Sequence, residues 1–327
     1  MSEEAQNDSI FSFLLDLSNP HRLGERRDED EDEENMKWLK SSDDVYSSCS
    51  DSNIVDKMEA GMYAVFQDSR GATHAQKVDP ETDELYYLPN NHINEIIKEV
   101  ASFWEKADKF EKYKLKHKRG LMLYGHPGTG KTSIKNLLCL ALIKNGGLVF
   151  TIANQTEFFW FVEFANSHLR VVEPHRPIIT IIEDIDKYMD GGGLESALLN
   201  FLDGDDSINH NVVIATTNRF DELNDLLLRP SRFDYAIEVE KPDLEVRKSY
   251  LINKGLEEAE AVKWAKDTNG YSLAELKELF ISVILLDLDY KKAKSKIKDQ
   301  ADTIENTTFH KPKGKAKTVG FNMGQKD

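Results

Sequence analysis

The segment that most constrains this chain is the glycine-rich run Gly125-His126-Pro127-Gly128-Thr129-Gly130-Lys131-Thr132. Four residues separate its first glycine from Gly-Lys-Thr, which is the spacing of a phosphate-binding P-loop. Apolar residues 121–124 precede the run and predict a buried strand, and residues 131–143 follow it with a helical apolar pattern. This order predicts a phosphate site, because glycines let backbone N–H groups approach phosphate oxygens at a helix N-terminus.

The last residues of this loop carry its charged chemistry. The pattern predicts that Lys131 bridges the β- and γ-phosphates of a nucleotide and that the Thr132 hydroxyl ligates Mg²⁺. A glycine turn that fits by chance is the alternative, and the flanking strand and helix argue against it. The residues expected to contact the nucleotide are Gly125, His126, Pro127, Gly128, Thr129, Gly130, Lys131, Thr132 and Ser133.

Length, charge and cysteine content limit the class of protein. The chain has 327 residues, which is enough for one large or two modest domains. Its formal net charge of −16 gives no global attraction to nucleic acid or anionic lipid. Cys49 and Cys139 lie far apart in no metal-binding spacing, and no apolar run approaches the roughly 18 residues of a membrane span. We therefore expect a reduced, cytoplasmic protein without a membrane span.

The first quarter of the chain changes composition twice. Residues 1–53 are acidic and are expected to be largely disordered, because residues 25–34 are nearly all charged and residues 41–52 are rich in Ser and Asp. An apolar island at residues 10–17 predicts either a helix folded back on the parent domain or a docking peptide for a partner. Residues 54–90 predict a small β element in front of the nucleotide domain.

The remainder of the chain predicts an α/β domain, a helical domain and a tail. Residues 91–241 alternate strands with helices, which indicates a parallel sheet with right-handed crossovers. Residues 242–290 are purely helical in pattern, and residues 291–327 form a lysine-rich tail that we expect to be disordered. The strands expected in the sheet are 121–124, 148–152, 177–182, 212–215 and 236–239.

Further polar groups follow the later strands of the predicted sheet. Glu183 and Asp184 end the third strand, where one carboxylate can hold Mg²⁺ and the next can polarise the attacking water. Asn218 follows the fourth strand and can bind that water or the γ-phosphate. Arg229 and Arg232 lie in a short turn before the fifth strand, and arginine is suited to stabilise a transferring phosphate. The alternatives are helix N-capping for the acids, a turn for Asn218 and a surface salt bridge for the arginines.

These motifs, in this order and spacing, resemble the AAA ATPase family of the AAA+ superclass. The resemblance covers roughly residues 91–288. It implies a P-loop NTPase sheet of strand order 5-1-4-3-2 between helices, followed by a small helical lid. It also implies a ring, usually a hexamer, with ATP at the subunit interfaces.

The resemblance assigns a role to each motif residue. Lys131 and Thr132 correspond to Walker A, and Asn218 corresponds to sensor 1. Arg229 and Arg232 correspond to arginine fingers that act on the neighbour's ATP. The catalytic residues it implies are Asp184, Glu183, Asn218, Arg229 and Arg232, the metal ligands are Thr132 and Glu183, and the cofactors are ATP and Mg²⁺.

Two segments resemble a branch of this family, the BCS-type mitochondrial AAA translocases and their prokaryotic and viral relatives. These segments are Leu198–Gly204 and Ile182–Asp186. The usual acidic order is Asp-Glu, whereas this chain has Glu183-Asp184. By alignment Glu183 takes the Mg²⁺ role and Asp184 the water-activating role, and the shorter Asp side chain predicts slower hydrolysis or a differently placed water.

The helical domain and two loops correspond in position to further motifs of this family. Residues 270–276 resemble the lid motif Gly-Phe-Ser-Gly-Ala-Asp-Leu. Ala274 falls where other AAA+ groups carry a sensor 2 arginine, and Lys277 is a weak substitute. The aromatic run 158–161 predicts either a substrate-gripping pore loop or the core of a helix. The glycine loop 189–193 falls where a second pore loop is expected.

We therefore expect a ring-forming, Mg²⁺-dependent AAA ATPase that remodels a protein partner and forms a homo-oligomer, a hexamer or a similar ring. One rival is a nucleic-acid motor or loader, supported by the basic residues 112–119 and the lysine-rich tail. The other rival is a nucleotide-dependent structural switch that scarcely turns over, for which the Glu183-Asp184 order is the hint.

Overall fold

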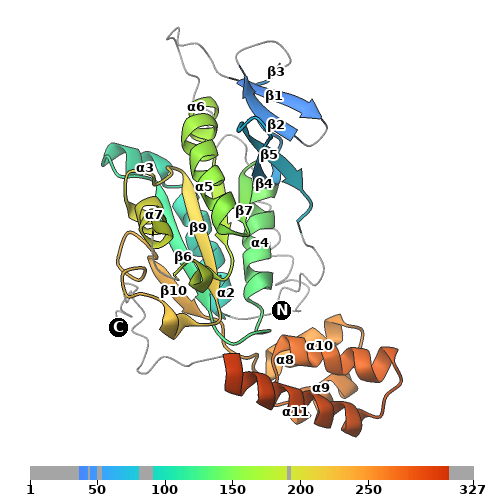
Figure 1. Ribbon diagram of the computed structural model, residues 1–327. Coiled ribbons are helices and arrows are strands. Elements are labelled where there is room, and N and C mark those ends of the chain that lie inside the picture. Colours follow the sequence, from blue (N-terminus) through green and yellow to red (C-terminus); the bar gives the residue numbers. More distant parts are fainter. Residues whose placement is uncertain (1–36, 43–44, 50–53, 81–90, 190–192, 309–327) are drawn as a thin grey trace.

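The computed structural model describes residues 37–42, 45–49, 54–80, 91–189 and 193–308. A parallel sheet forms its centre (Figure 1). Starting from the edge strand β10, five strands follow the order β10-β6-β9-β8-β7, and every neighbouring pair among them is parallel. In chain order this is 5-1-4-3-2, which confirms the predicted strand order. These strands are β6 (Lys118–Tyr124), β7 (Leu148–Ile152), β8 (Ile178–Ile182), β9 (Asn211–Thr217) and β10 (Tyr235–Glu238).

Helices cover both faces of this sheet. The central strand β9 is buried throughout and sends alternate residues to opposite cores. Val212 and Ile214 join the core beneath α2 and α4, whereas Val213 and Ala215 join the core beneath α5 and α7. The four helices are α2 (Asn91–Trp104), α4 (Lys131–Lys144), α5 (Gln155–Phe164) and α7 (Gly193–Asp203).

Shorter elements complete this domain. Helix α5 continues through a π-helical turn (Ala165–Leu169) into α6 (Arg170–Val172). Helix α3 (Ala107–Lys112) precedes β6, and two 3₁₀ turns follow the strands β8 and β9 at Ile185–Tyr188 and Phe220–Glu222. These 3₁₀ turns hold the segments directly after the two strands whose ends carry the predicted polar groups.

The sheet does not stop at β7. Strand β4 (Gly61–Gln67) pairs parallel with β7, and antiparallel strands extend the sheet to ten. The added strands are β5 (Thr73–Val78), β2 (Val45–Cys49), β1 (Lys37–Ser42) and β3 (Ile54–Val55).

This extension corrects two expectations. The β element expected at residues 54–90 is present as β4 and β5, but it is continuous with the nucleotide-domain sheet, because β4 uses the open hydrogen-bonding edge of β7. Part of residues 1–53 is ordered rather than disordered, because β1 and β2 lie in that range. The physical reason is a tertiary contact: Tyr46 is buried edge-on against Tyr63, with ring centroids 5.8 Å apart. The apolar island at residues 10–17 lies outside the described residues, as do residues 190–192 of the glycine loop.

Four helices form the lid around a core of their own. They are α8 (Leu244–Asn253), α9 (Glu258–Asp267), α10 (Leu273–Phe280) and α11 (Tyr290–Thr308). Their starts follow ordinary capping chemistry. The Asp243 side chain accepts from the Val246 N–H, and Ser272 with Glu275 forms a capping box at α10.

Helix α11 corrects the expectation of a disordered tail from residue 291. Ala293 and Ile297, four residues apart, lie on one face and fill the lid core. Lys294 adds an ion pair with Asp267 at 2.7 Å. Two apolar residues thus pack a lysine-rich helix against the lid core, although the average composition of this segment predicted a disordered tail in solvent. Residues 309–327 lie outside the described part of the chain.

Within the described ranges, no helix combines the length and the apolar character needed to cross a membrane.

Candidate active site

The P-loop joins the end of β6 to the start of α4, as the sequence predicts. Gly125, Gly128 and Gly130 have φ values of +144°, +77° and +109°, which favour glycine. A Cβ at Gly125 would lie 2.5 Å from the Val239 carbonyl oxygen, so the loop has no room for side chains there. Gly130 is the N-cap of α4 and provides no side-chain cap. The first N–H groups of α4 are therefore left for an anion.

Lys131 is buried and folded back onto this loop. Its ammonium donates to the carbonyl oxygens of Gly125 and His126, each at 2.9 Å. Burial lowers the pKa of Lys131 to about 8, and the nearby charge of Asp184 acts in the opposite direction. Carbonyl dipoles, and a carboxylate that makes no ion pair with it, only partly satisfy this cation. A phosphate in the loop would supply the full negative charge that it lacks here.

The two acidic residues leave β8 in different directions and bind different lysines. Asp184 has a φ of +47°, and its backbone N–H donates to the Thr216 hydroxyl at 3.3 Å. Its carboxylate accepts from the ammonium of Lys187 at 2.8 Å. The carboxylate of Glu183 instead pairs with Lys135 of α4. Both predicted catalytic acids therefore have a lysine as a cationic partner.

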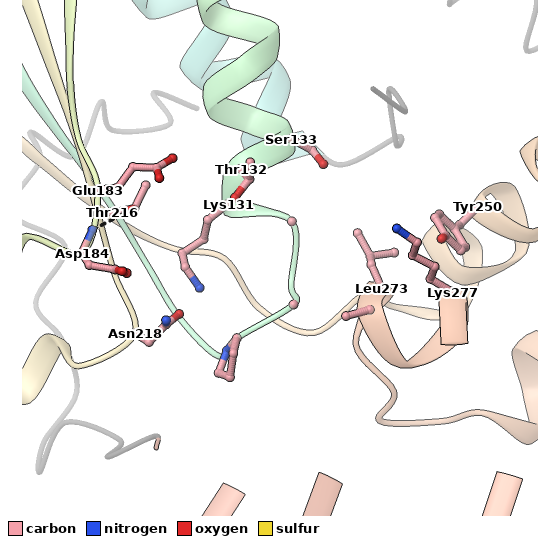
Figure 2. A pocket seen from close by; sticks show the side chains of 14 residues that line it. Lys131, Thr132, Ser133, Glu183, Asp184, Thr216, Asn218, Tyr250, Leu273 and Lys277 are labelled. Atoms are coloured by element: carbon pink, nitrogen blue, oxygen red, sulfur yellow. Dashed lines mark hydrogen bonds between the residues drawn. The ribbon is translucent and has the colours of Figure 1, made fainter. Parts of the chain in front are cut away.

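Asn218, one strand further, has an unused acceptor. Its side-chain oxygen is buried, and no hydrogen-bond donor within the described residues reaches it. A buried amide oxygen without a donor is unfavourable unless water or a ligand binds it. Figure 2 shows Asn218 pointing toward Lys131 from the opposite wall of the same hollow. This orphaned acceptor marks a place for a water molecule next to the P-loop lysine.

A cavity of about 380 Å³ connects these groups. The P-loop and the ends of β8 and β9 form one side, and lid helices form the other (Figure 2). The lid is held close by a hydrogen bond from the Ala274 N–H to the Gly128 carbonyl at 3.2 Å. The cavity is lined by Pro127, Gly128, Gly130, Lys131, Thr132, Ser133, Glu183, Asp184, Thr216, Asn218, Tyr250, Leu273, Ala274 and Lys277.

Most predicted nucleotide contacts meet in this cavity, but three do not line it. Gly125 and His126 turn their carbonyls to Lys131, and the Thr129 hydroxyl donates to the His126 carbonyl at 2.9 Å. These three residues shape the loop. Sequence reasoning missed the contributions of Thr216, Tyr250 and Leu273. A Cβ on Gly128 would lie 2.6 Å from the Cβ of Ala274. The small residue at position 274 of the lid motif was therefore a sequence signal that the lid packs closely against the P-loop.

The two arginines lie away from this cavity. Arg229 is exposed. The Arg232 side chain is 14% exposed, pairs through Nε with Asp203 at 2.8 Å, and donates to the Leu226 carbonyl at 2.8 Å. Neither residue lines the cavity of its own chain. Any contact with a nucleotide therefore requires the cavity of another copy.

The aromatic run 158–161 belongs mainly to the core. Phe158 and Phe161 lie on the buried face of α5, and Trp160 of the same helix packs against the same core. Phe159 is half exposed. The interpretation of the run as four pore-lining aromatics is therefore wrong for Phe158 and Phe161, because helical periodicity turns these residues toward the sheet.

The residues present fit a nucleoside triphosphate with Mg²⁺. Positive-φ glycines form a cradle that side chains would fill, a buried ammonium lacks a full counter-charge, and Asn218 has an orphaned oxygen. A hydroxyl and a carboxylate, Thr132 and Glu183, supply the oxygen ligands that Mg²⁺ prefers, and this ion commonly completes its shell with phosphate oxygens and water. Both residues line the cavity.

Comparison with protein families finds one match, over residues 121–241. The matching family is described as ATPase family associated with various cellular activities (AAA). The match begins in β6 and ends just after β10, so it contains the P-loop, the acidic pair, Asn218 and both arginines.

Among curated proteins, the chain is similar to bacterial proteins named ATP-dependent zinc metalloprotease FtsH. The Halothermothrix orenii protein is 32% identical over 235 residues, which cover 65% of this chain and 37% of the relative. The Aquifex aeolicus protein is 30% identical over 240 residues, covering 66% and 37%. FtsH 1 of Alkaliphilus metalliredigens is 34% identical over 179 residues, covering 50% and 30%. The chain thus spans about a third of the length of these relatives. The narrower resemblance to the BCS-type branch stays a prediction.

Proposed function

We propose that the chain binds ATP with Mg²⁺ in the P-loop cavity and hydrolyses it at the interfaces of a homo-oligomeric ring, a proposal that the match of residues 121–241 to the AAA family supports. The proposed work of the ring is to remodel a protein partner. One observation carries the proposal: the P-loop lysine, the acidic pair and an orphaned asparagine oxygen, from three separate strands, line one cavity closed by a lid.

Each residue has a distinct proposed role. The Lys131 ammonium leaves the loop carbonyls and binds the β- and γ-phosphates, while the first N–H groups of α4 bind phosphate oxygens. Thr132 and Glu183 hold Mg²⁺, which when bound neutralises charge on the phosphates. Asp184 accepts a hydrogen bond from the attacking water and polarises it, and Asn218 orients that water. To do so, Asp184 exchanges its contact with Lys187 for the water.

In the proposed ring, a neighbouring chain supplies the positive charge beside the γ-phosphate that a single chain does not provide. Arg229 is exposed, and Arg232 is held near the surface by Asp203. In the proposal, a neighbouring copy binds against this segment, and the guanidinium groups stabilise the transferring phosphate in that copy's cavity. Hydrolysis then depends on two chains at each site.

The proposed location is the cytoplasm, an expectation that rests on the separated cysteines.

A subunit-mixing experiment tests this arrangement. Arg232→Ala protein, which lacks the proposed finger, is mixed with Lys131→Ala protein, which lacks the proposed phosphate contact, and steady-state ATP hydrolysis is measured at saturating Mg²⁺. Shared sites predict that the two variants, each inactive alone, recover part of the wild-type activity when mixed, because a Lys131→Ala chain can present its Arg232 to the intact cavity of an Arg232→Ala chain. Arg219→Ala is the matched control and should be active alone, since Arg219 is a nearby surface arginine paired with Glu222. No recovery in the mixture would mean self-contained sites and would remove the arginine-finger role.

The contacts of the acidic pair support a second candidate, a slow nucleotide-dependent switch. Both carboxylates are bound to lysines, so hydrolysis requires that at least one of these ion pairs opens. A single-turnover measurement separates the two functions. A motor hydrolyses one bound ATP in seconds, whereas a switch retains it for many minutes while still changing its assembly state.

A further inference from the structure

We infer that Lys135 is a positioning residue of the proposed ATPase site, which pairs with the Glu183 carboxylate and, through its positive charge, raises the Mg²⁺ concentration that the site needs. The inference rests on the proposed function and adds a residue that neither the P-loop pattern nor the acidic pair predicts. Lys135 touches no nucleotide in this proposal. It acts only through the carboxylate of Glu183.

The position of Lys135 on α4 places it under the site. It follows Lys131 by four residues, so both lysines lie on one face of the helix. The Lys135 side chain is 9% exposed and pairs with Oε1 of Glu183, whose side chain is 48% exposed. Glu183 lines the cavity, whereas Lys135 does not. The carboxylate therefore faces the cavity on one side and a buried ammonium on the other.

A buried lysine at this position is unfavourable for folding alone. Neighbouring buried positions of α4, such as Ile134, Leu138 and Leu142, are apolar and fill the core beneath the sheet. Placing an ammonium among them requires its desolvation, and replacing a buried ion pair with apolar groups is often neutral or stabilising. The pair is therefore better explained by what it does to Glu183 than by stability.

The other acid of the site provides the contrast. The Lys187 side chain, which binds Asp184, is 71% exposed, so this ion pair is screened by water and opens easily. Lys135 has no such freedom, because its stem is enclosed by the core. Asp184 can thus be released to a water molecule during hydrolysis, whereas Glu183 stays beside a fixed positive charge.

A fixed ammonium beside a metal-binding carboxylate has two opposing effects. It holds the carboxylate in one orientation, which favours binding of a metal ion. It also competes with a divalent cation for the negative charge of the same carboxylate, and in a partly buried site this competition is the larger effect because solvent screens the ion pair weakly. We therefore expect removal of the charge to lower the Mg²⁺ requirement.

The test compares Lys135→Met with Lys135→Arg in the full chain. Methionine keeps the length of the buried stem without the charge, whereas arginine keeps the charge. Binding of a fluorescent ATP analogue is titrated with Mg²⁺, and the same titration is made in excess EDTA. The half-saturating Mg²⁺ concentration should fall about three- to tenfold for Lys135→Met and change less than about twofold for Lys135→Arg. Analogue affinity in EDTA should be equal for all three proteins.

A double-mutant cycle with Glu183→Gln shows whether the effect passes through Glu183. In that background Lys135→Met should leave the half-saturating Mg²⁺ concentration unchanged. An equal Mg²⁺ requirement in wild type and Lys135→Met would overturn the inference. A change in analogue affinity in EDTA as large as the change with Mg²⁺ would also overturn it. If Lys135→Met does not fold, Lys135→Gln replaces it with the same expectation. Wild type that binds no analogue, with or without Mg²⁺, would instead overturn the proposed function itself.

Discussion

The two edges of the central sheet differ in how their buried polar groups are bonded. At the carboxyl edge, formed by the ends of β6, β8 and β9, Asn218 has an unused buried oxygen and Lys131 binds only carbonyl oxygens. At the amino edge, where the same strands begin, most polar side chains are bonded to one another and to the backbone, and Nε of Arg170 is an exception. His117, Arg170 and His210 are the main members of that network.

Hydrogen bonds at the amino edge form a chain with a definite direction. Nε2 of His117 lies 2.9 Å from the Phe103 carbonyl, which can only accept, so this nitrogen carries the proton. Nδ1 of His117 therefore accepts from Nδ1 of His210 at 3.0 Å. Nε2 of His210 in turn accepts from Nδ1 of His175 at 3.3 Å. Every nitrogen in this chain that faces the protein is occupied by a partner.

A shifted pKa alone does not distinguish the two edges. Burial lowers the pKa of Lys131 to about 8 and, together with the charges of His117, Arg170 and His175, lowers the pKa of His210 to about 3. At the carboxyl edge such a shift occurs beside a cavity that an unsatisfied acceptor, the Asn218 oxygen, also lines. An unsatisfied group alone does not indicate a ligand site, because Nε of Arg170 at the amino edge is also buried without a partner among the described residues. An unsatisfied acceptor that lines a cavity is therefore the better sign of a ligand site.

The strongest test of this comparison is Lys131→Ala. Loss of the ammonium should reduce ATP-analogue affinity by at least about a hundredfold, because two charged phosphate contacts disappear. The folded state should lose little stability, since this lysine makes only carbonyl contacts here. Fluorescence titration measures the affinity, and urea unfolding measures the stability. In wild type, affinity should also fall as the pH rises above about 8, where Lys131 loses its proton.

The next effect in size is that of Asp184→Asn. Asparagine keeps the shape of the side chain but cannot polarise the water as a carboxylate does, so kcat should fall about 10²- to 10³-fold. ATP-analogue affinity should stay within about threefold of wild type. Lys187→Met is the control, because it removes only the exposed partner of Asp184. An equal loss of binding and turnover in Asp184→Asn would contradict the assigned role.

The sequence predicted the carboxyl edge well because each of its motifs is local. A glycine loop between a strand and a helix, and a polar residue directly after a strand, depend on residues close in the chain. Strand order came from the resemblance to the AAA family. Lys135 was missed because its contact with Glu183 joins two elements, and the β4–β7 pairing was missed for the same reason. The lysine-rich average composition of this segment gave no indication that Ala293 and Ile297 pack α11 against the lid core.

Arg170→Met tests the amino edge. The guanidinium donates to the carbonyl oxygens of Glu173, Arg176 and His210 at 3.2, 2.7 and 3.2 Å. Methionine leaves these acceptors without a donor, so the free energy of unfolding should fall by about 2–3 kcal/mol. ATP-analogue affinity of the folded protein should be unchanged. Arg170→Lys, which keeps one donor group, should lose less stability. A large loss of affinity with unchanged stability would erase the distinction between the edges.

The smallest expected effect is a loss of stability in mild acid that depends on His210. In the unfolded chain this imidazole binds a proton near its ordinary pKa of about 6.5, whereas in the folded chain its pKa is about 3. Its contribution is therefore complete above pH 6.5 and is lost as the pH falls from 6.5 toward 3. Between pH 7 and 5 the upper limit is about 2 kcal/mol, and partial exposure of the ring reduces this to about 1 kcal/mol.

His210→Asn is the matched variant for this measurement. Asparagine tolerates the positive φ of +49° at this position and cannot take up a proton. Urea unfolding at pH 7 and pH 5 should show that wild type loses about 1 kcal/mol more than His210→Asn over this interval. His74→Asn is the control, because His74 of β5 lies outside the hydrogen-bonded chain of His117, His175 and His210. An equal loss in wild type and His210→Asn would mean that His210 takes up a proton without loss of the hydrogen bonds at the amino edge. The proposed difference between the two edges in hydrogen bonding would then disappear.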